Sequence, residues 1–356
     1  MSRPIPVRNI WILFLYAEDL VQFRDKYERD VEDARDLPDL VGRLLAHVVE
    51  DRMRKNLSRG YRYKSAVLQR VRGRIDMLAT ETAQLMDRGQ VACRFEEHVM
   101  DTPRNRLVRT ALERLAARVE NIETAHRCRK LAADFARLGV SGMRPSRAQL
   151  ATDQIGRNES ADRMMVALAR MVFDGSIPTE IEGNALQPGD EITEHLIRRL
   201  FERAVGNACR IQLEPKGWHV AQGRRISWPV SDASSGLYGI LPSMQTDIEL
   251  NHTQSGRRVV IDTKFTKIFT SSNYRSEVLR SGYLYQMYSY LRTQEQESDA
   301  PSLSAKGILL HPQTGGYVNE MMMVQGHEIS FRTIDLTASA SIFERQLRLL
   351  DTAEAG

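Results

Sequence analysis

Two carboxylates and a lysine, Asp247, Asp262 and Lys264, stand close together in the C-terminal half of the chain. Asp262 and Lys264 end a run rich in apolar residues, residues 257–264, which is typical of a buried strand. Successive side chains of a strand point to opposite faces, so Asp262 and Lys264 share one face and Thr263 points to the other. Asp247 begins a second apolar run, and a hairpin between the two runs would place its carboxylate beside Asp262.

The chemistry expected of this group follows from its oxygen atoms. The carboxylates of Asp247 and Asp262 are hard ligands suited to Mg²⁺, for which Mn²⁺ can substitute, and the Thr263 carbonyl and waters would complete the shell. Such an ion polarises a phosphate and activates a water, while Lys264 orients that water or stabilises the developing negative charge. The pattern predicts a metal-dependent phosphodiesterase. A lone Asp-x-Lys triplet is more often an ion pair on an edge strand, so the prediction depends on the residues around it.

Composition limits the class of protein. The chain has 356 residues, 42% hydrophobic and 27% charged, which is enough for two ordinary domains. The apolar run at residues 10–17 is too short to span a bilayer and lacks a signal-peptide cleavage site, so we expect a cytoplasmic protein that does not enter a membrane. Cys93, Cys128 and Cys209 are too few and too far apart for a disulfide framework or a zinc knuckle, and are expected to be buried and inert.

The N-terminal part of the chain is expected to be mainly helical, with a few short strands. The densest cluster of helix and strand breakers, residues 183–190, predicts a boundary between an N-terminal partner-binding domain, residues 1–184, and a C-terminal domain, residues 185–356. We expect helices over residues 10–23, 37–53, 105–119, 124–138 and 162–173, and strands over residues 61–71 and 90–95.

The C-terminal part changes to an alternation of helices and short apolar strands. This order predicts an α/β domain with a mixed sheet flanked by helices. We expect helices over residues 191–209, 276–292 and 339–350, and strands over residues 210–213, 247–250, 257–264, 305–310, 316–324 and 329–335.

With these elements in order, the sequence resembles the PD-(D/E)xK nuclease superfamily, with Asp247, Asp262 and Lys264 on its three motif positions. It departs from the pattern in one detail, because the motif proline is displaced upstream to Pro242.

Three further residues extend this resemblance. Gln286 and Tyr290 match the Gln-x-x-x-Tyr signature of RecB-like nucleases, and their spacing puts both on one helical face, toward DNA or the active site. Glu202 lies on the preceding helix, where such nucleases often carry an extra acidic residue that can serve the metal. Taken singly, Tyr290 would be a core residue and Glu202 a solvated charge.

Six segments in the right order narrow the resemblance to the McrC family, over essentially the whole chain. They are residues 5–10 with Tyr16 and Ala17, then 71–76, 101–106, 241–248, 262–265 and 284–287. The resemblance implies a nuclease subunit of a modified-cytosine restriction system, which stimulates and works with an McrB-like AAA+ GTPase and cuts methylated double-stranded DNA. No Gly-x-x-x-x-Gly-Lys-[Ser/Thr] phosphate loop occurs in the sequence, which agrees with a motor on another chain.

Charge is divided unevenly along the chain. Residues 185–356 hold 18 Lys and Arg against 19 Asp and Glu, a net of −1, while residues 1–184 hold 32 against 27, a net of +5. The catalytic half should therefore hold DNA weakly by itself. Arg70, Arg72 and Arg74 alternate along the expected strand and would contact a motor subunit or DNA, or merely protect a solvated edge. The resemblance favours contact with the partner.

Two other functions remain open. A stand-alone RecB-like nuclease of DNA repair or processing would share the site but need its own DNA grip, and would be strongly active without a partner. A non-catalytic adaptor that only activates a GTPase would tolerate loss of Asp262. The intact Asp247, Asp262 and Lys264 argue against the adaptor.

Overall fold

The computed structural model describes residues 5–153, 155, 160–174, 190–266, 269–270, 278–313 and 316–348. Its contacts divide the chain into two compact units. The first, here called the sheet unit, combines residues 1–32 with residues 185–356, and the second, the arm unit, comprises residues 33–184. The expected N-terminal domain of residues 1–184 is thus divided, because its first 32 residues pack with the C-terminal part. The expected boundary at residue 184 lies outside the described residues.

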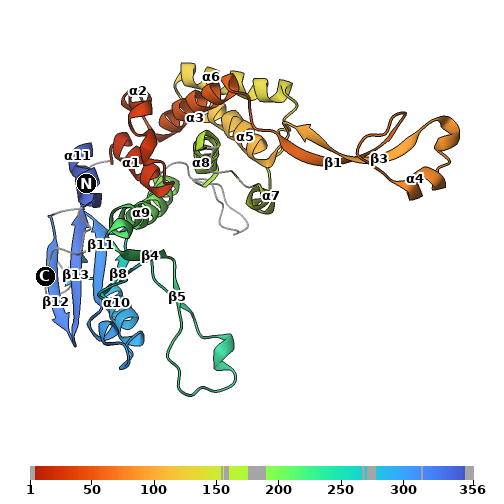
Figure 1. Ribbon diagram of the computed structural model, residues 1–356. Helices are drawn as coiled ribbons and strands as arrows, with labels where there is room; N and C mark the ends of the chain where they lie inside the picture. Colours follow the sequence, from red (N-terminus) through yellow and green to blue (C-terminus); the bar gives the residue numbers. More distant parts are fainter. Residues whose placement is uncertain are drawn as a thin grey trace. The chain divides into compact units, whose positions relative to one another are not determined.

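A six-stranded mixed sheet forms the centre of the sheet unit, as the sequence predicts (Figure 1). The strand order is β12-β13-β11-β8-β7-β4, in which β8 and β13 run parallel to β11 and the other neighbours are antiparallel. The strands are β4 (Trp218–Gln222), β7 (Ile248–His252), β8 (Arg258–Thr263), β11 (Lys306–Pro312), β12 (Asn319–Val324) and β13 (His327–Ile334).

Four helices pack within this unit, namely α1 (Val7–Ala17), α9 (Asp190–Leu213), α10 (Ser281–Thr293) and α11 (Ala340–Arg348). Met287 and Leu291 of α10 share a hydrophobic core with strand residues Val260 and Leu309, so α10 covers that face of the sheet. The burial and the contacts of α1 explain why this helix belongs to the sheet unit. Every residue from Ile10 to Ala17 is buried, α1 packs on α9 and α11, and the Asn9 amide donates to two carbonyls that precede α11.

Shorter elements connect these helices and strands. They are η1 (Val21–Phe23), η2 (Asp25–Tyr27), α2 (Glu28–Glu32), η4 (Glu214–Lys216), β5 (Arg225–Ile226), η5 (Leu237–Gly239), β6 (Met244–Gln245), β9 (Phe269–Thr270), β10 (Val278–Leu279) and η6 (Ala300–Ser304).

Three expected elements of the sheet unit are wrong in whole or in part. The helix expected over residues 276–292 begins only at Ser281, and Val278–Leu279 form β10 instead. The strand expected at residues 210–213 is the end of α9, and the first strand begins only at Trp218, after Gly217 reverses the chain with a φ of +85°. The first helix ends at Ala17 rather than at residue 23, where η1 follows instead.

The arm unit has a helical body and a long arm, residues 60–99 (Figure 1). The body contains α3 (Leu37–Arg54), α5 (Pro103–Arg118), α6 (Ile122–Arg137), α7 (Arg147–Thr152) and α8 (Ser160–Asp174). The arm is the antiparallel pair β1 (Gly60–Leu68) and β3 (Val91–Val99), with β2 (Arg74–Ile75), α4 (Met77–Thr82) and η3 (Met86–Arg88) toward its tip.

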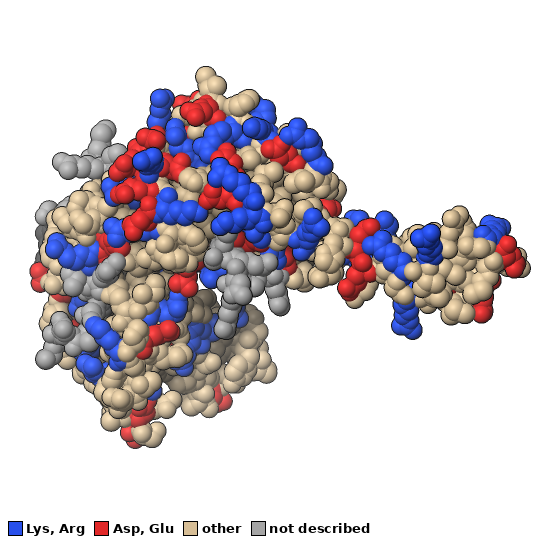
Figure 2. Space-filling view, turned by 45° about the horizontal axis from the view of Figure 1, so that its top comes forward, with Lys and Arg blue, Asp and Glu red and all other residues tan. Residues whose placement is uncertain are grey.

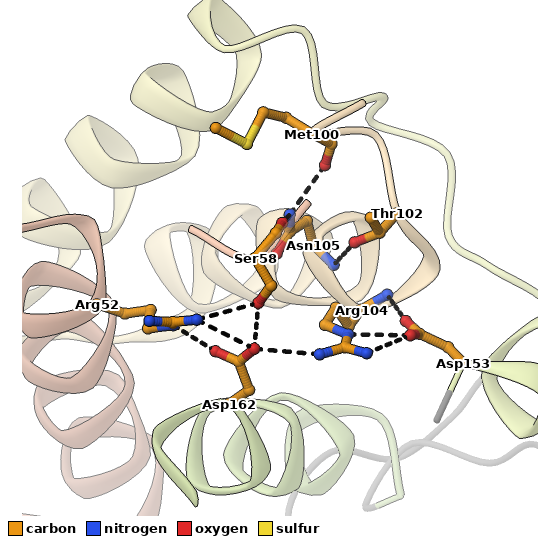
Figure 3. A network of polar contacts seen from close by, with 8 residues as sticks. All are labelled: Arg52, Ser58, Met100, Thr102, Arg104, Asn105, Asp153 and Asp162. Atoms are coloured by element: carbon orange, nitrogen blue, oxygen red, sulfur yellow. Dashed lines mark hydrogen bonds and ion pairs between the residues drawn. The ribbon is translucent and has the colours of Figure 1, made fainter. Parts of the chain in front are cut away.

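A buried polar network fixes the base of the arm to the helices (Figure 3). The Asn105 amide donates to the carbonyls of Ser58 and Met100, which flank the arm, at 3.0 and 2.8 Å. Asp162 of α8 accepts from Arg52 Nε at 2.5 Å, from Arg104 Nη1 at 3.1 Å and from the Ser58 hydroxyl. Apart from the Asn105 side-chain oxygen, which is buried without a partner, these groups are paired with one another, so the network fixes the base of the arm to the helices.

The burial of the three cysteines agrees with the sequence prediction. Cys93, Cys128 and Cys209 are buried and form no disulfide, and burial raises the pKa of Cys128 to about 12. No helix in the described part of the chain is long and apolar enough to cross a membrane.

Candidate active site

The pairing of β7 with β8 brings the two aspartates together. Ile248 lies opposite Ile261, so Asp247 and Asp262 are the next pair in the same antiparallel register. Asp262 is 1% exposed at the end of an apolar strand, and Lys264 directly follows that strand. The sheet thus delivers both carboxylates and the ammonium to one end of β8.

Hydrogen bonds hold each member of this group in place. The Asp247 carboxylate accepts from the Thr263 amide at 2.7 Å and from the Thr263 hydroxyl at 2.9 Å, both on Oδ2. Lys264 Nζ donates to Asp262 Oδ1 at 3.0 Å and lies 2.8 Å from Oδ2. Thr263, expected on the opposite face of the strand, therefore also orients a carboxylate of the site.

The site carries more negative than positive charge. Burial raises the pKa of Asp262 to about 6; the Lys264 ammonium opposes this rise, whereas Asp247 and Glu202 add to it. Burial, and then Asp247, also raise the pKa of Glu202 on α9. Burial is the main cause of both raised pKa values, and the neighbouring carboxylates add to it, a combination typical of functional sites.

Gln286 and Tyr290 connect α10 to the segment that carries Asp247. Gln286 Nε2 donates to the Tyr290 hydroxyl at 2.5 Å, and this hydroxyl donates to the Gln245 carbonyl at 2.7 Å. Tyr290 is buried, and burial raises its pKa. Both side chains therefore position the chain just before Asp247.

Tyr283, Thr266 and His311 also belong to the site, and the sequence interpretation missed them. Lys264 Nζ lies 5.2 Å from the centre of the Tyr283 ring, and the Thr266 hydroxyl donates to the Tyr283 hydroxyl at 3.2 Å. The buried His311 ring nitrogen Nδ1 lies 3.0 Å from the Thr266 carbonyl, and burial lowers the pKa of His311. A histidine inside the apolar run of β11 was the available sequence signal.

Comparison with known proteins decides the family. Residues 7–312 match the family described as McrBC 5-methylcytosine restriction system component. The chain belongs to this family. The type IV methyl-directed restriction enzyme EcoKMcrBC of Escherichia coli K12 is 23% identical over 343 residues, which cover 94% of each chain. A half-complex from the tetradecameric assembly of Thermococcus gammatolerans McrB AAA+ hexamers with bound McrC contains a chain of similar fold, with a TM-score of 0.54 at 15% identity. The match covers 98% of this chain and 77% of that chain.

The site formed by Asp247 and Asp262 fits a hard cation that takes few ligands from the protein. Among the described residues, no three His, Cys, Asp or Glu side chains converge as a complete metal cage. Mg²⁺ needs no such cage, because it keeps several waters and binds through one or two carboxylates. Asp262 Oδ2 is buried with no donor in hydrogen-bond geometry, although the Lys264 ammonium is near it, and the Asp247 bonds from Thr263 both fall on Oδ2. One oxygen of each aspartate is thus left for a ligand.

Arg70, Arg72 and Arg74 lie in the arm, but all three come after the end of β1, whose expected range was residues 61–71. β1 stops at Leu68, and Gly73 turns the chain with a φ of +69°. The Arg72 guanidinium lies 4.1 Å from the centre of the Phe95 ring, and Arg74 lies in β2. All three arginines are exposed, so they remain available to a partner even though they do not alternate on one strand.

Proposed function

We propose that this McrBC-family chain is the nuclease subunit of a methylation-dependent restriction system, a metal-dependent DNA endonuclease whose sheet unit is a PD-(D/E)xK nuclease domain. The observation that carries the proposal is the under-compensated Asp262, buried at the end of β8 beside Asp247, Glu202 and a single lysine. A buried carboxylate with a raised pKa, and with one oxygen that accepts no hydrogen bond, is poorly suited to a structural role and well suited to hold a cation.

Asp247 and Asp262 would hold Mg²⁺, or Mn²⁺ in its place, with the Thr263 carbonyl, and Glu202 would add a further carboxylate at the edge of the site. When bound, the ion polarises the scissile phosphate and makes the attacking water more acidic. Lys264, fixed by Asp262 and packed near Tyr283, stabilises the negative charge that develops on the phosphate oxygens. Thr263 keeps Asp247 in position through two hydrogen bonds.

The partner in this proposal is an McrB-like AAA+ GTPase, which recognises methylated double-stranded DNA and whose GTP hydrolysis the chain stimulates. Membership of the McrBC family and the related McrB complex with bound McrC support it. The arm is the surface best suited to this contact, because it exposes apolar side chains that its own unit does not cover. Tyr63 and Leu78 are 81% and 77% exposed, and we include Arg70, Arg72 and Arg74 in the same surface.

Reconstitution of the two subunits tests this function. The chain, the partner, GTP and Mg²⁺ together should cleave a methylated plasmid, whereas neither protein alone should. Equal cleavage without the partner would instead indicate a stand-alone repair nuclease. Stimulated GTP hydrolysis without any cleavage would indicate a non-catalytic adaptor.

A further inference from the structure

The positive charge of the chain lies in the arm unit. Residues 33–184 hold 27 Lys and Arg against 21 Asp and Glu, a net of +6, whereas residues 1–32 and 185–356 together hold 23 against 25, a net of −2. Figure 2 shows Lys and Arg side chains along the arm and over the helices beside it. Since phosphate neutralisation supplies most sequence-independent affinity for DNA, the sheet unit is poorly equipped to hold DNA and the arm unit is better equipped.

Two arginines of this unit lie over one aromatic ring, and the charge of a third acts on one of them. We call these three residues, Arg114, Arg118 and Arg144, the arginine cluster. The guanidinium of Arg144 lies 4.1 Å and that of Arg114 5.4 Å from the centre of the buried Phe173 ring. Arg118 follows Arg114 by one turn of α5 and therefore projects from the same side of the helix. Burial lowers the pKa of Arg114, and the charges of Arg118 and Arg144 lower it further.

The arginine cluster differs from several other arginines of α5 and α6, which have carboxylate partners. Arg109 pairs with Glu113 at 2.9 Å, Arg127 with Glu50 at 3.0 Å, and Arg137 with Asp134. In the described part of the chain, no carboxylate forms an ion pair with any member of the cluster. Like charges one helical turn apart destabilise a helix, so this arrangement has an energetic cost that a bound anion would remove.

We propose that the arginine cluster binds the phosphate backbone of double-stranded DNA without regard to its sequence. Guanidinium groups match phosphate oxygens in paired hydrogen bonds, and the Phe173 ring holds two of the three in a fixed position by cation–π contacts. Backbone contacts of this kind position a protein on DNA and read no bases. The site is separate from the nuclease residues, and its binding requires neither metal nor partner.

The test measures binding of the full chain to an unmethylated duplex in EDTA by fluorescence anisotropy, between about 50 and 200 mM salt. Each phosphate contact contributes about 0.9 to the slope of log affinity against log salt. The double variant Arg118→Ala with Arg144→Ala should therefore lower the slope by about 1.8, and lower the affinity at low salt by on the order of tenfold or more. Both side chains are exposed, so the fold should tolerate their removal.

Two further double variants serve as controls. Arg127→Ala with Arg137→Ala removes the same charge from arginines that already have carboxylate partners, and should change the slope much less. Arg118→Lys with Arg144→Lys keeps the charge and should retain most of the slope. If the Arg118→Ala, Arg144→Ala variant unfolds, comparison of the double lysine variant with the single variant Arg144→Gln still measures the contribution of the arginine cluster.

Several results would overturn the proposal. They are an absence of DNA binding by the parent chain at low salt, an unchanged slope in the cluster variant, and an equal loss in the cluster and control variants. An unchanged DNA slope, together with weaker partner binding in a separate pull-down, would show that the cluster docks a protein instead. Because the assay includes no partner, metal or cleavage, its outcome is independent of the proposed nuclease function.

Discussion

Two buried aspartates, one in each unit, show how differently this chain treats a carboxylate removed from water. Asp162 is 0% exposed and Asp262 is 1% exposed. Asp162 lies between the guanidiniums of Arg52 and Arg104 and accepts a further hydrogen bond from Ser58 (Figure 3). Asp262 has the single ammonium of Lys264, with two other carboxylates acting on it.

The difference separates a structural carboxylate from a functional one. Burying a charge is tolerated when partners neutralise it, and the Asp162 network does this while it fixes the base of the arm. At Asp262 burial raises the pKa, Asp247 and Glu202 add to the rise, and the Lys264 ammonium only partly opposes it. Buried charge alone therefore says little about function, whereas incomplete compensation of that charge is informative.

The largest expected effect concerns the proposed metal ion. Chelation with EDTA should abolish cleavage by the reconstituted complex, and Mg²⁺ or Mn²⁺ should restore it. Ca²⁺ should support DNA binding but little turnover, because its coordination is looser and it activates water poorly. GTP hydrolysis by the partner also needs a divalent ion, so loss of cleavage could reflect loss of GTP hydrolysis. Cleavage should therefore be measured with Mn²⁺ or Ca²⁺ while the rate of GTP hydrolysis is followed in the same sample. Cleavage that survives EDTA would show that Asp262 does not act as a metal ligand, and its contrast with Asp162 would then have no functional meaning.

Loss of the Asp162 charge should be the next largest effect, and it should act on stability. Asp162→Asn leaves Arg52 and Arg104 without their shared carboxylate, which should lower the free energy of unfolding by about 3–5 kcal/mol. Urea denaturation of the full chain measures it. Asp134→Asn, which removes an ion pair made by an exposed arginine on α6, is the control and should change stability by less than about 1 kcal/mol. Equal effects of the two variants would mean that the network is unimportant.

Substitution of Asp262 by asparagine should have the opposite effect to Asp162→Asn, because it should raise the free energy of unfolding. Without metal, the folded pKa of Asp262 is about 6, above its ordinary value of 3.8. The folded chain then binds more protons than the unfolded chain between these values, so this group makes the free energy of unfolding fall as pH rises through that window. In EDTA above pH 7, Asp262→Asn should stabilise the chain by on the order of 1–2 kcal/mol, a gain limited by the loss of the Lys264 pair.

Urea denaturation at two pH values checks this sign. The stabilising effect of Asp262→Asn should be absent below about pH 4, where the parent carboxyl is protonated in both states. A variant that is less stable than the parent above pH 7 would show that Asp262 is compensated after all.

A smaller effect on the cleavage rate is expected from residues that position the site without belonging to it. Tyr290→Phe removes the hydrogen bond to the Gln245 carbonyl, worth about 1 kcal/mol, and should lower the cleavage rate by about fivefold. Tyr288→Phe, on the same helix, removes a hydroxyl that contacts Gln325 instead and should leave cleavage unchanged. Equal rates for the two variants would rule out the positioning role of Tyr290.

The sequence was informative where one short segment determines the geometry. Strand alternation and a hairpin placed Asp247, Asp262 and Lys264 together, because their relation depends only on β7 and β8. The mixed sheet also followed from the apolar runs. Tyr283 and His311 could not be found in this way, because they approach Lys264 or Thr266 from α10 and β11 through packing between elements distant in sequence.

Two further predictions were wrong or incomplete, because a local sequence pattern does not show which elements pack against it or where the backbone turns. The apolar run at residues 10–17 indicated a buried helix, but not that it packs with α9 and α11. The alternation of Arg70, Arg72 and Arg74 indicated one strand, but Gly73 adopts a positive φ and the strand ends before it. Backbone turns of this kind override the two-residue period of a strand.

Cleavage by Asp262→Ala in the reconstituted complex tests the central claim most directly. The reaction should contain methylated DNA, the partner, GTP and Mg²⁺, with GTP hydrolysis followed in the same sample. We predict that cleavage falls by several orders of magnitude while stimulated GTP hydrolysis stays at the parent rate, because a metal ligand of the nuclease site is lost and the arm is untouched. Cleavage at the parent rate by Asp262→Ala would contradict the assignment of this site as the nuclease centre.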